Sequence, residues 1–186
     1  MPRIDVIEPE DATGRLAEIY REIAGSRGKI AEVHKIQSLN PETIRQHMDL
    51  YMGIMFGASP LRRAQREMMA VVVSAANGCL YCQQHHLEAL LHFWKDQERA
   101  EALRRDHRSL ELAPVDRALC DYAWELTRDP DRAEREDPTR RLREAGLEDR
   151  AVLDATLVVG YFNFVNRIVQ ALGLELETDP GGYSYE

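Results

Sequence analysis

The chain lacks most features of secreted, membrane-spanning or nucleic-acid-binding proteins. Its 186 residues include only three cysteines, too few for the disulfide framework of a small secreted domain. Lys and Arg number 24 against 32 Asp and Glu, and this net charge of −8 works against tight nucleic-acid binding, which needs a basic face. The longest nearly uncharged runs, 68–76 and 155–165, are too short to cross a bilayer, and the first residues do not resemble a signal segment. We therefore expect a cytoplasmic protein without nucleic-acid or membrane partners.

The composition that is present is that of one ordinary globular domain. Hydrophobic residues make up 44% of the chain and charged residues 30%. A chain of this size buries about 70% of its extended surface on folding, so it needs no disulfide or metal to be stable. We expect a single domain over residues 1–186, with N-terminal helices in 1–58, the helices that carry the chemistry in 59–95, and C-terminal helices in 113–173.

Apolar residues recur at helical spacing along nearly the whole chain, and no alternating, β-branched run competes with them. Asn40-Pro41 and Ser59-Pro60 are typical helix starts, and Asn77-Gly78 and Asp129-Pro130 are typical ends. The predicted helices are 11–24, 40–55, 60–76, 79–94, 115–126, 138–146 and 151–172. The charged stretch 129–137 is predicted to be a solvated loop. The last helix is apolar nearly all round, which predicts a central place in an all-α bundle.

The residues that can carry chemistry lie between Glu67 and His86. Cys79 and Cys82 open a helix directly after a helix-breaking pair, where the helix dipole and free N–H groups stabilise a thiolate. At about 100° per residue, His86 lies about 20° from Cys79 and about 40° from Cys82 around this helix, so we expect it to face both sulfurs. The break also folds the preceding helix back, which brings Glu67 towards the imidazole. The four side chains predict a proton relay in which Glu67 orients His86 and His86 takes a proton from a cysteine.

The spacing Glu-x11-Cys-x2-Cys-x3-His, formed by Glu67, Cys79, Cys82 and His86, resembles the alkylhydroperoxidase (AhpD-like) and carboxymuconolactone decarboxylase superfamily. The run SAANGCLYCQQHH is similar to its peroxidase-related branch, and MFGASPLRRAQREMMAVVVSAA and GYFNFVNRIVQALG extend the resemblance over most of the chain. The decarboxylase branch lacks the cysteine pair, which argues against lactone decarboxylation. The resemblance implies an AhpD-like helical bundle, commonly a dimer, trimer or hexamer, that reduces hydroperoxides through a cysteine pair.

The resemblance and the physics of the helix terminus disagree about the two sulfurs. The resemblance assigns peroxide attack to Cys82 and resolution to an exposed Cys79, and we follow it. Position at the helix start alone favours Cys79 as the more acidic thiol. Tyr81 stands where the best-defined alkylhydroperoxidases have a histidine, and a phenol is a poor base at neutral pH, which leaves efficient turnover with the usual thiol reductant in question.

Two classes of function stay open at this stage. The first is a thiol-dependent peroxidase with a hydroperoxide substrate and a dithiol reductant. The second is a redox adaptor or sensor that exchanges disulfides with a partner protein. Sequence cannot separate them, because both need a reactive cysteine pair.

Simpler alternatives apply to several of the same residues. The two cysteines with His86 and Glu67 could ligate zinc, but structural zinc usually takes more sulfur, and two buried, inert cysteines are a further alternative. We expect no metal and no cofactor, and we interpret the Met-rich stripe of the helix after Asn40 as core. Four other histidines are interpreted as surface or packing residues: His34, His47, His92 and His107.

Two weaker patterns concern architecture. A shift of 84 residues lays 163–166 over 79–82, as in two facing, pseudo-symmetric lobes of which only one kept its thiols, although coincidence explains this equally well. If the repeat is real, the segment 161–166 lies near the pocket. Cys120 and Trp124 lie outside the apolar stripe of their own helix, which predicts a homo-oligomer that buries them, with packing inside the chain as the alternative.

Overall fold

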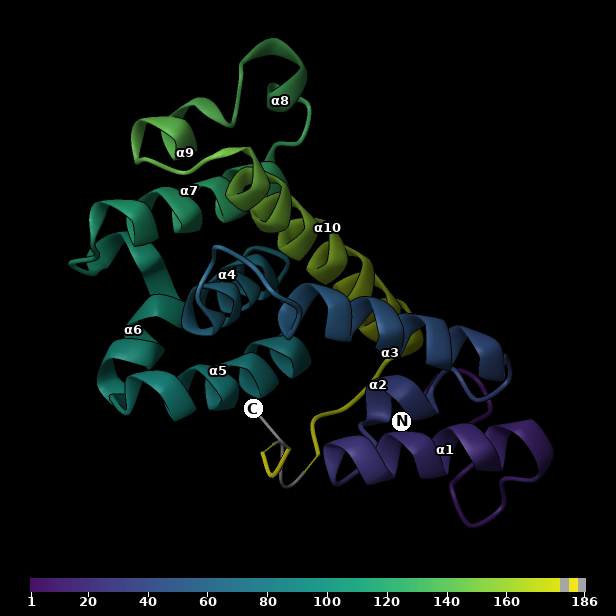
Figure 1. Cartoon of the computed structure of the whole chain (residues 1–186). Coiled ribbons are helices and arrows are strands. Elements are labelled where there is room, and N and C mark those ends of the chain that lie inside the picture. The colour runs from purple at the N-terminus through teal and green to yellow at the C-terminus, as the bar shows by residue number, and fades with distance from the viewer. Residues whose placement is uncertain (178–180, 184–186) are drawn as a thin grey trace.

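The computed structural model describes residues 1–177 and 181–183, apart from the side chains of 133 and 134, and the described residues contain helices but no strands (Figure 1). The helices are α1 (Gly14–Arg27), α2 (Glu32–Lys35), α3 (Pro41–Met55), α4 (Arg63–Ala76), α5 (Leu80–Trp94), α6 (Gln97–Asp106), η1 (His107–Ser109), α7 (Pro114–Arg128), α8 (Arg132–Arg135), α9 (Arg140–Glu144) and α10 (Asp149–Leu172). The predicted all-α fold class is confirmed.

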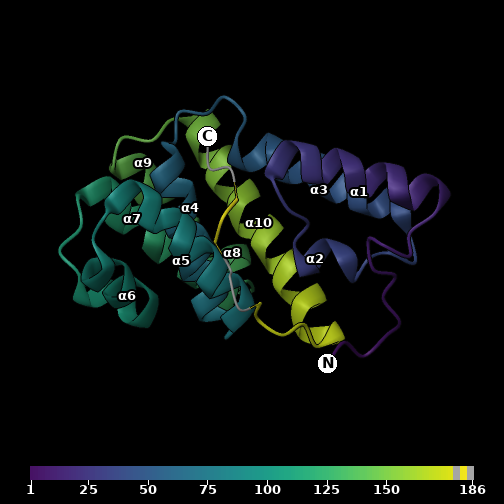
Figure 2. The ribbon, with the colours of Figure 1, turned by 90° about the horizontal axis from the view of Figure 1, so that it is seen from below.

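The helices form two groups with α10 running between them (Figure 2). One group holds α4 to α7, and the other holds α1 to α3, near the C-terminal half of α10. Helix α4 packs against α5, α6, α7 and α10, while α3 packs against α1 and α10. The C-terminal segment then returns across the space between α5 and α1.

Helix α4, not α10, is the central helix. Eleven of the 14 residues of α4 are buried. The prediction that the last helix lies at the centre is wrong, because α10 leaves Leu153, Leu157 and Phe164 exposed at 54%, 43% and 49%. These three side chains follow helical spacing, so they form one apolar stripe on the outer side of α10, which we name the α10 stripe.

Helix α10 is also long and apolar enough to cross a membrane, judged by length and composition alone. Asp154 and Arg167 interrupt its apolar sequence, so α10 contains no uncharged run long enough to cross a bilayer. Within the molecule, 56% of its most apolar window is buried. The core helix of a globular bundle can have the same length and apolar composition.

Several helix boundaries differ from the prediction for identifiable reasons. Helix α4 begins at Arg63 rather than at Pro60 because the Ser59 hydroxyl donates to Asp154 Oδ2 (2.6 Å) and accepts from the N–H of Leu61 (3.1 Å). The side chain of Gln65 instead accepts from the backbone N–H of Arg62 at 2.9 Å. Helix α1 spans Gly14–Arg27, later than the predicted 11–24.

Four short elements were not predicted. Helix α6 buries only Ala100 and Leu103, so its apolar pattern is too sparse to identify, although the Asp96 side chain caps it by accepting from the Arg99 N–H at 3.0 Å. Helix α2 and η1 have four and three residues. The stretch 129–137 is not only loop, since it contains the four-residue helix α8.

The turn between α4 and α5 forms as predicted. Gly78 has φ +66°, a left-handed conformation that side chains with a Cβ rarely adopt. The N–H of Cys79 then donates to the Ser74 carbonyl at 2.9 Å, which closes the end of α4. As a result α5 folds back along α4, and Cys79 becomes its N-cap residue.

On α7, the structure favours packing inside the chain over the predicted subunit contact. Cys120 is fully buried within the chain. Trp124 is half-buried, with its ring 5.6 Å from that of His107 and the Arg108 guanidinium 5.5 Å above it. Both residues therefore find their partners inside the same chain, which was the alternative considered. The homo-oligomer itself stays a prediction.

Candidate active site

The two cysteines lie one helical turn apart at the start of α5, and both are free thiols. Cys79 is 2% exposed and Cys82 is 3% exposed, so the expectation of an exposed Cys79 is wrong. A hydrogen bond from the Cys82 thiol lowers the pKa of Cys79 against the effect of burial, with help from the Cys82 N–H and the charge of Arg167. The same contact, together with burial, raises the pKa of Cys82. Cys79 is thus the more acidic thiol, as the helix terminus predicted.

Glu67 and His86 meet as the spacing predicted. His86 Nδ1 lies 2.6 Å from Glu67 Oε2. Arg63 holds the other carboxylate oxygen, with Nε 2.8 Å from Oε1, and the Arg63 guanidinium stacks 3.6 Å from the ring centroid of Phe56. Burial raises the pKa of the Glu67 carboxyl, but His86 and Arg63 more than compensate, so its pKa is lowered and Glu67 is an ionised, fully buried carboxylate. Sequence reasoning missed Arg63, although an Arg four residues before a Glu on one helix is a recognisable pair.

A pocket of about 80 Å³ joins this pair to one of the sulfurs. Its walls come from α5, α10, α3, the segment around α2 and the C-terminal segment: Arg27, Lys29, Ala31, Val33, His34, Tyr51, Tyr81, Cys82, His85, His86, Ala89, Tyr161, Phe162, Val165 and Tyr183. Cys82 and His86 line it, whereas Cys79 does not. Cys82 thus shares the pocket with His86, while the prediction that His86 is the partner of both sulfurs stays a prediction.

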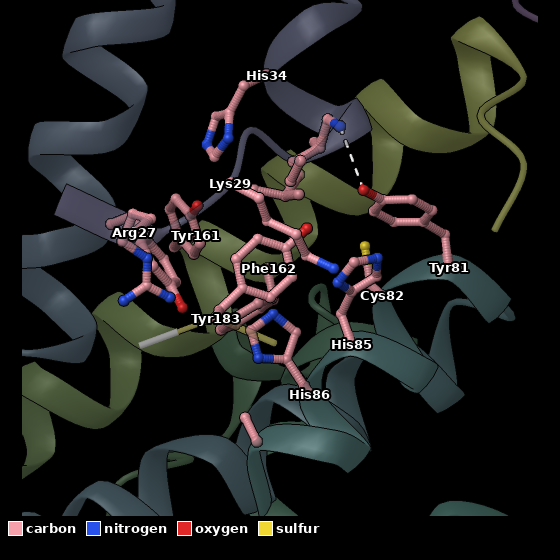
Figure 3. A pocket seen from close by; sticks show the side chains of 15 residues that line it. Arg27, Lys29, His34, Tyr81, Cys82, His85, His86, Tyr161, Phe162 and Tyr183 are labelled. Atoms are coloured by element: carbon pink, nitrogen blue, oxygen red, sulfur yellow. Dashed lines mark hydrogen bonds between the residues drawn. The ribbon is translucent and has the colours of Figure 1, made fainter. Parts of the chain in front are cut away.

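The pocket is mainly aromatic, with cationic groups on one side. In Figure 3, Arg27, Tyr161 and His34 lie on one side of the pocket, and Tyr81, Cys82 and His85 lie on the other. The ring of Phe162 packs edge-on against His86, with 4.4 Å between centroids. Such walls exclude water and suit a small ligand with an apolar body and few polar atoms.

Tyr81 has a structural contact in place of a proton-transfer role. Its hydroxyl donates to Glu177 Oε1 at 2.9 Å. It also accepts from the Val33 N–H at 3.3 Å, the dashed line in Figure 3. Burial and the charge of Glu177 raise the pKa of Tyr81, so the phenol stays protonated. Glu177 Oε2 also contacts His85 Nε2 at 2.7 Å, and despite partial burial the hydrogen bond and charge of His85 lower the Glu177 pKa to about 2. Glu177 thereby ties the C-terminal segment to α5.

Asn166 is a functional neighbour that the motif did not reveal. It is fully buried, and its hydrogen bond to Cys82 works to lower the pKa of that thiol. Asn77 Nδ2 donates to Asn166 Oδ1 at 2.9 Å, which fixes the amide beside the turn before α5. The expectation that 161–166 lies near the pocket is confirmed, because Tyr161, Phe162 and Val165 line it. Two pseudo-symmetric lobes stay a prediction.

Two of the four remaining histidines belong to the pocket region, which sequence spacing did not indicate. His34 lines the pocket, and burial first, then the neighbouring His47, Arg27 and His85, lowers its pKa to about 3. His47 is buried behind it, with Nε2 2.7 Å from the Tyr161 hydroxyl oxygen. His107 packs as expected, 3.0 Å from Asp121. Among the residues that the structure describes, no three His, Cys, Asp or Glu side chains are grouped so as to hold a metal ion.

Comparison with known proteins agrees with the resemblance seen in the sequence. The model of the Carboxymuconolactone decarboxylase family matches residues 41–125. An uncharacterized peroxidase-related protein from Silicibacter sp. TM1040 is 28% identical, with a TM-score of 0.82 over 95% of this chain and 94% of that one. The alkylhydroperoxidase AhpD core of an uncharacterized peroxidase-related protein from Ralstonia eutropha JMP134 is 24% identical, with a TM-score of 0.84 over 95% and 93% of the two chains. The debrominase Bmp8 is 18% identical, with a TM-score of 0.77 over 94% and 92%.

The last two likenesses, below 25% identity, show the fold alone. The family match covers the two cysteines, Glu67 and His86, and the relative from Silicibacter extends the likeness to nearly the whole chain. The family model over residues 41–125 and the likeness to the peroxidase-related protein from Silicibacter support the resemblance of this chain to the alkylhydroperoxidase (AhpD-like) and carboxymuconolactone decarboxylase superfamily.

Proposed function

We propose that the protein is a thiol-dependent peroxidase that reduces organic hydroperoxides or hydrogen peroxide through a disulfide cycle of Cys79 and Cys82. The observation that carries the proposal is the position of Cys82 and His86 in one pocket, with the buried Glu67 carboxylate 2.6 Å from His86 Nδ1. This arrangement offers a nucleophile, a proton carrier and a fixed negative charge that orients the imidazole.

The first step requires a thiolate at Cys82. The cysteine pair loses one proton to His86. The remaining proton is shared between the two sulfurs, which are hydrogen-bonded to each other. When peroxide arrives, this proton moves to Cys79 and leaves Cys82 as the thiolate. The Cys82 thiolate attacks the distal peroxide oxygen, the O–O bond breaks, and Cys82 becomes a sulfenic acid. The alkoxide that leaves takes the proton from His86 and departs as an alcohol.

The second step forms the disulfide and resets the relay. The Cys79 thiol passes its proton to His86 and attacks the Cys82 sulfur, forming the S–S bond. The hydroxide displaced from Cys82 takes that proton and leaves as water. An external dithiol then reduces the disulfide, so each cycle converts one hydroperoxide and one dithiol into an alcohol, a water and an oxidised dithiol.

The alternative function is a redox adaptor or sensor that exchanges disulfides with a partner protein. Disulfide exchange requires a partner sulfur to approach in line with a sulfur of this chain. Cys79 and Cys82 are 2% and 3% exposed, which favours a small oxidant that enters the pocket over a protein. We place the cycle in the cytoplasm, where dithiol reductants are maintained.

Intact-mass analysis after addition of one equivalent of cumene hydroperoxide tests the proposal. We expect the reduced protein to lose two hydrogens and dithiothreitol to restore them. Cys79→Ser should stop at a sulfenic acid that dimedone traps, and Cys82→Ser should not react. Cys120→Ser is the matched control, because Cys120 is buried away from the pocket, and it should behave as the wild type.

Two outcomes contradict the peroxidase. Thiols that persist in the wild type after peroxide treatment would show that the pocket does not reduce peroxide. Oxidation by an oxidised dithiol protein such as a thioredoxin, without oxidation by peroxide, would favour the adaptor.

A further inference from the structure

We infer that the hydroxyl of Tyr161 is a hydrogen-bond donor built into the pocket for the substrate, where it binds the peroxide oxygen that leaves with the organic group. This inference rests on the proposed peroxidase function and adds a residue outside the Glu, Cys, Cys, His motif. It follows from assigning the donor and the acceptor in each hydrogen bond of a chain of three side chains, Gln37, His47 and Tyr161.

The chain begins at the Gln37 amide, whose orientation is fixed. Gln37 Nε2 donates to the Val33 carbonyl at 2.7 Å, which only the NH₂ end of the amide can do. The same nitrogen lies 2.8 Å from His47 Nδ1. Because an NH₂ group is a donor only, His47 Nδ1 must accept this hydrogen bond and carry no proton.

The next side chain, His47, accepts a hydrogen bond at Nδ1 and donates one from Nε2. His47 is 4% exposed, and burial lowers its pKa to about 4, so the ring is neutral at neutral pH. A neutral imidazole with an unprotonated Nδ1 carries its proton on Nε2. His47 Nε2 lies 2.7 Å from the Tyr161 hydroxyl oxygen, so His47 donates and Tyr161 accepts.

The phenolic proton of Tyr161 must then point away from His47. Among the described residues, the Tyr161 hydroxyl makes no hydrogen bond besides the one with His47, and Tyr161 lines the pocket. Burial first, and then neighbouring groups that include Cys82, raise the pKa of Tyr161, so the phenol keeps its proton and lies within electrostatic range of the attacking sulfur. The result is an oriented O–H donor at a pocket wall.

The position of this donor fits the leaving oxygen. A thiolate attacks the distal oxygen along the O–O axis, so the leaving oxygen lies on the far side from the sulfur. In Figure 3, Tyr161 lies on the side of the pocket opposite Cys82. A donor fixed in advance where negative charge develops stabilises the transition state more than the ground state.

His34 supplies an independent sign that a ligand belongs on this wall. It is 9% exposed and lines the pocket, and its Nδ1 is buried without a hydrogen-bond partner. Its ring lies 5.4 Å from that of His47, so it lies beside the same hydrogen-bonded chain. A buried, unpaired ring nitrogen is costly unless a ligand satisfies it, and the O–H of the alcohol product, which forms on the leaving oxygen, can donate to it.

Tyr161→Phe tests the inference, with Tyr122→Phe as the matched control. Tyr122 is also a buried tyrosine, with its hydroxyl 2.7 Å from Thr156 Oγ1, but it does not line the pocket. We expect Tyr161→Phe to lower the second-order rate of Cys82 oxidation by cumene hydroperoxide about 100-fold. Alkylation of Cys82 by iodoacetamide has no leaving oxygen in this position and should change less than about twofold, since alkylation follows the thiolate fraction. Tyr122→Phe should change neither rate.

The tautomer of His47 is a second, activity-independent readout. Nitrogen-15 NMR should show a protonated Nε2 and an unprotonated Nδ1 in the reduced wild type. A proton on Nδ1 would overturn the inference, because Tyr161 would then donate to His47. An unchanged peroxide rate in Tyr161→Phe would overturn it as well.

Binding of the alcohol product separates this inference from the proposed function. The probe is 2-phenyl-2-propanol, titrated into the reduced protein and followed by NMR. A wild type that binds this alcohol more tightly than Tyr161→Phe but ignores peroxide would support the Tyr161 site while rejecting the peroxidase. Rapid peroxide reduction with equal alcohol binding in both proteins would reject Tyr161 alone.

Discussion

His86 Nδ1 and Glu67 Oε2 lie 2.6 Å apart although the two residues are 19 positions apart in the chain. The contact exists because Gly78 turns α5 back along α4. Arg63 neutralises one carboxylate oxygen and leaves the other for the imidazole. The relay is therefore a property of the packed α4 and α5 pair rather than of either helix.

Loss of the Glu67 charge should slow the chemistry. Glu67→Gln keeps the shape of the side chain but removes the carboxylate that contacts His86 Nδ1, so we expect thiol alkylation and peroxide oxidation at neutral pH to slow about tenfold or more. His86→Ala should do the same, and the double variant should be no slower than the worse single variant, since both act on one proton path. Glu88→Gln, on the same helix α5, is the control. Additive losses would show that the two residues act separately.

The cysteine contact makes a prediction about thiol acidity. The pKa of Cys79 is lowered mainly because Cys82 donates a hydrogen bond to its sulfur. Cys82→Ala removes the donor and should raise the Cys79 pKa, whereas Cys82→Ser keeps a donor and should raise it less. The thiolate absorbance in the ultraviolet, followed against pH, measures both. Equal pKa values in the two variants would place the cause in the helix terminus.

Glu177 should contribute to stability in a defined range of pH. Its pKa is about 2 in the folded protein, below its ordinary value near 4.3, so the folded state favours the ionised form. The stabilisation is fully present above about pH 4.5 and is lost as the pH falls towards 2. Because the carboxylate is partly exposed, we expect about 1 kcal/mol. Urea unfolding of Glu177→Gln should show the loss at pH 7 and little difference from the wild type near pH 2. A constant difference across this range would contradict the assignment.

The α10 stripe is the surface on which we expect a second copy of the chain. Leu153, Leu157 and Phe164 are exposed along one side of α10, and Leu50 of the adjacent α3 is 49% exposed. Contiguous apolar side chains of this kind are usually covered in an assembly. Sedimentation equilibrium should give an oligomer for the wild type and a smaller mass for Leu157→Arg. Leu39→Arg, an isolated exposed leucine at 59%, should have no effect. A single-chain mass for the wild type at micromolar concentration would reject self-association.

Local sequence signals predicted the parts of the site that local structure determines. The Asn77-Gly78 break and the cysteine spacing predicted the start of α5, and the return of α5 along α4 followed, which brought Glu67 to His86. The start of α4 was wrong because Ser59 bonds Asp154, 95 positions away in the chain. No local pattern reveals such a partner.

The missed residues were missed for the same physical reason. Asn166 reaches Cys82 from α10, and His34 and His47 reach the pocket wall from α2 and α3. Each of these contacts depends on how helices distant in sequence pack. Arg63 is the exception, since its spacing to Glu67 was visible in the sequence.

The burial of both sulfurs also shapes the kinetics of the proposed cycle. Cys79 is 2% exposed and lies behind Cys82, so a reductant must reach the disulfide through the pocket that peroxide used. Oxidant and reductant therefore compete for one entrance. A dithiol that occupies the pocket of the reduced enzyme blocks peroxide, and a peroxide that occupies the pocket of the oxidised enzyme blocks the dithiol. The steady-state rate should follow a ping-pong law with double substrate inhibition: excess dithiol slows turnover, and more peroxide relieves it.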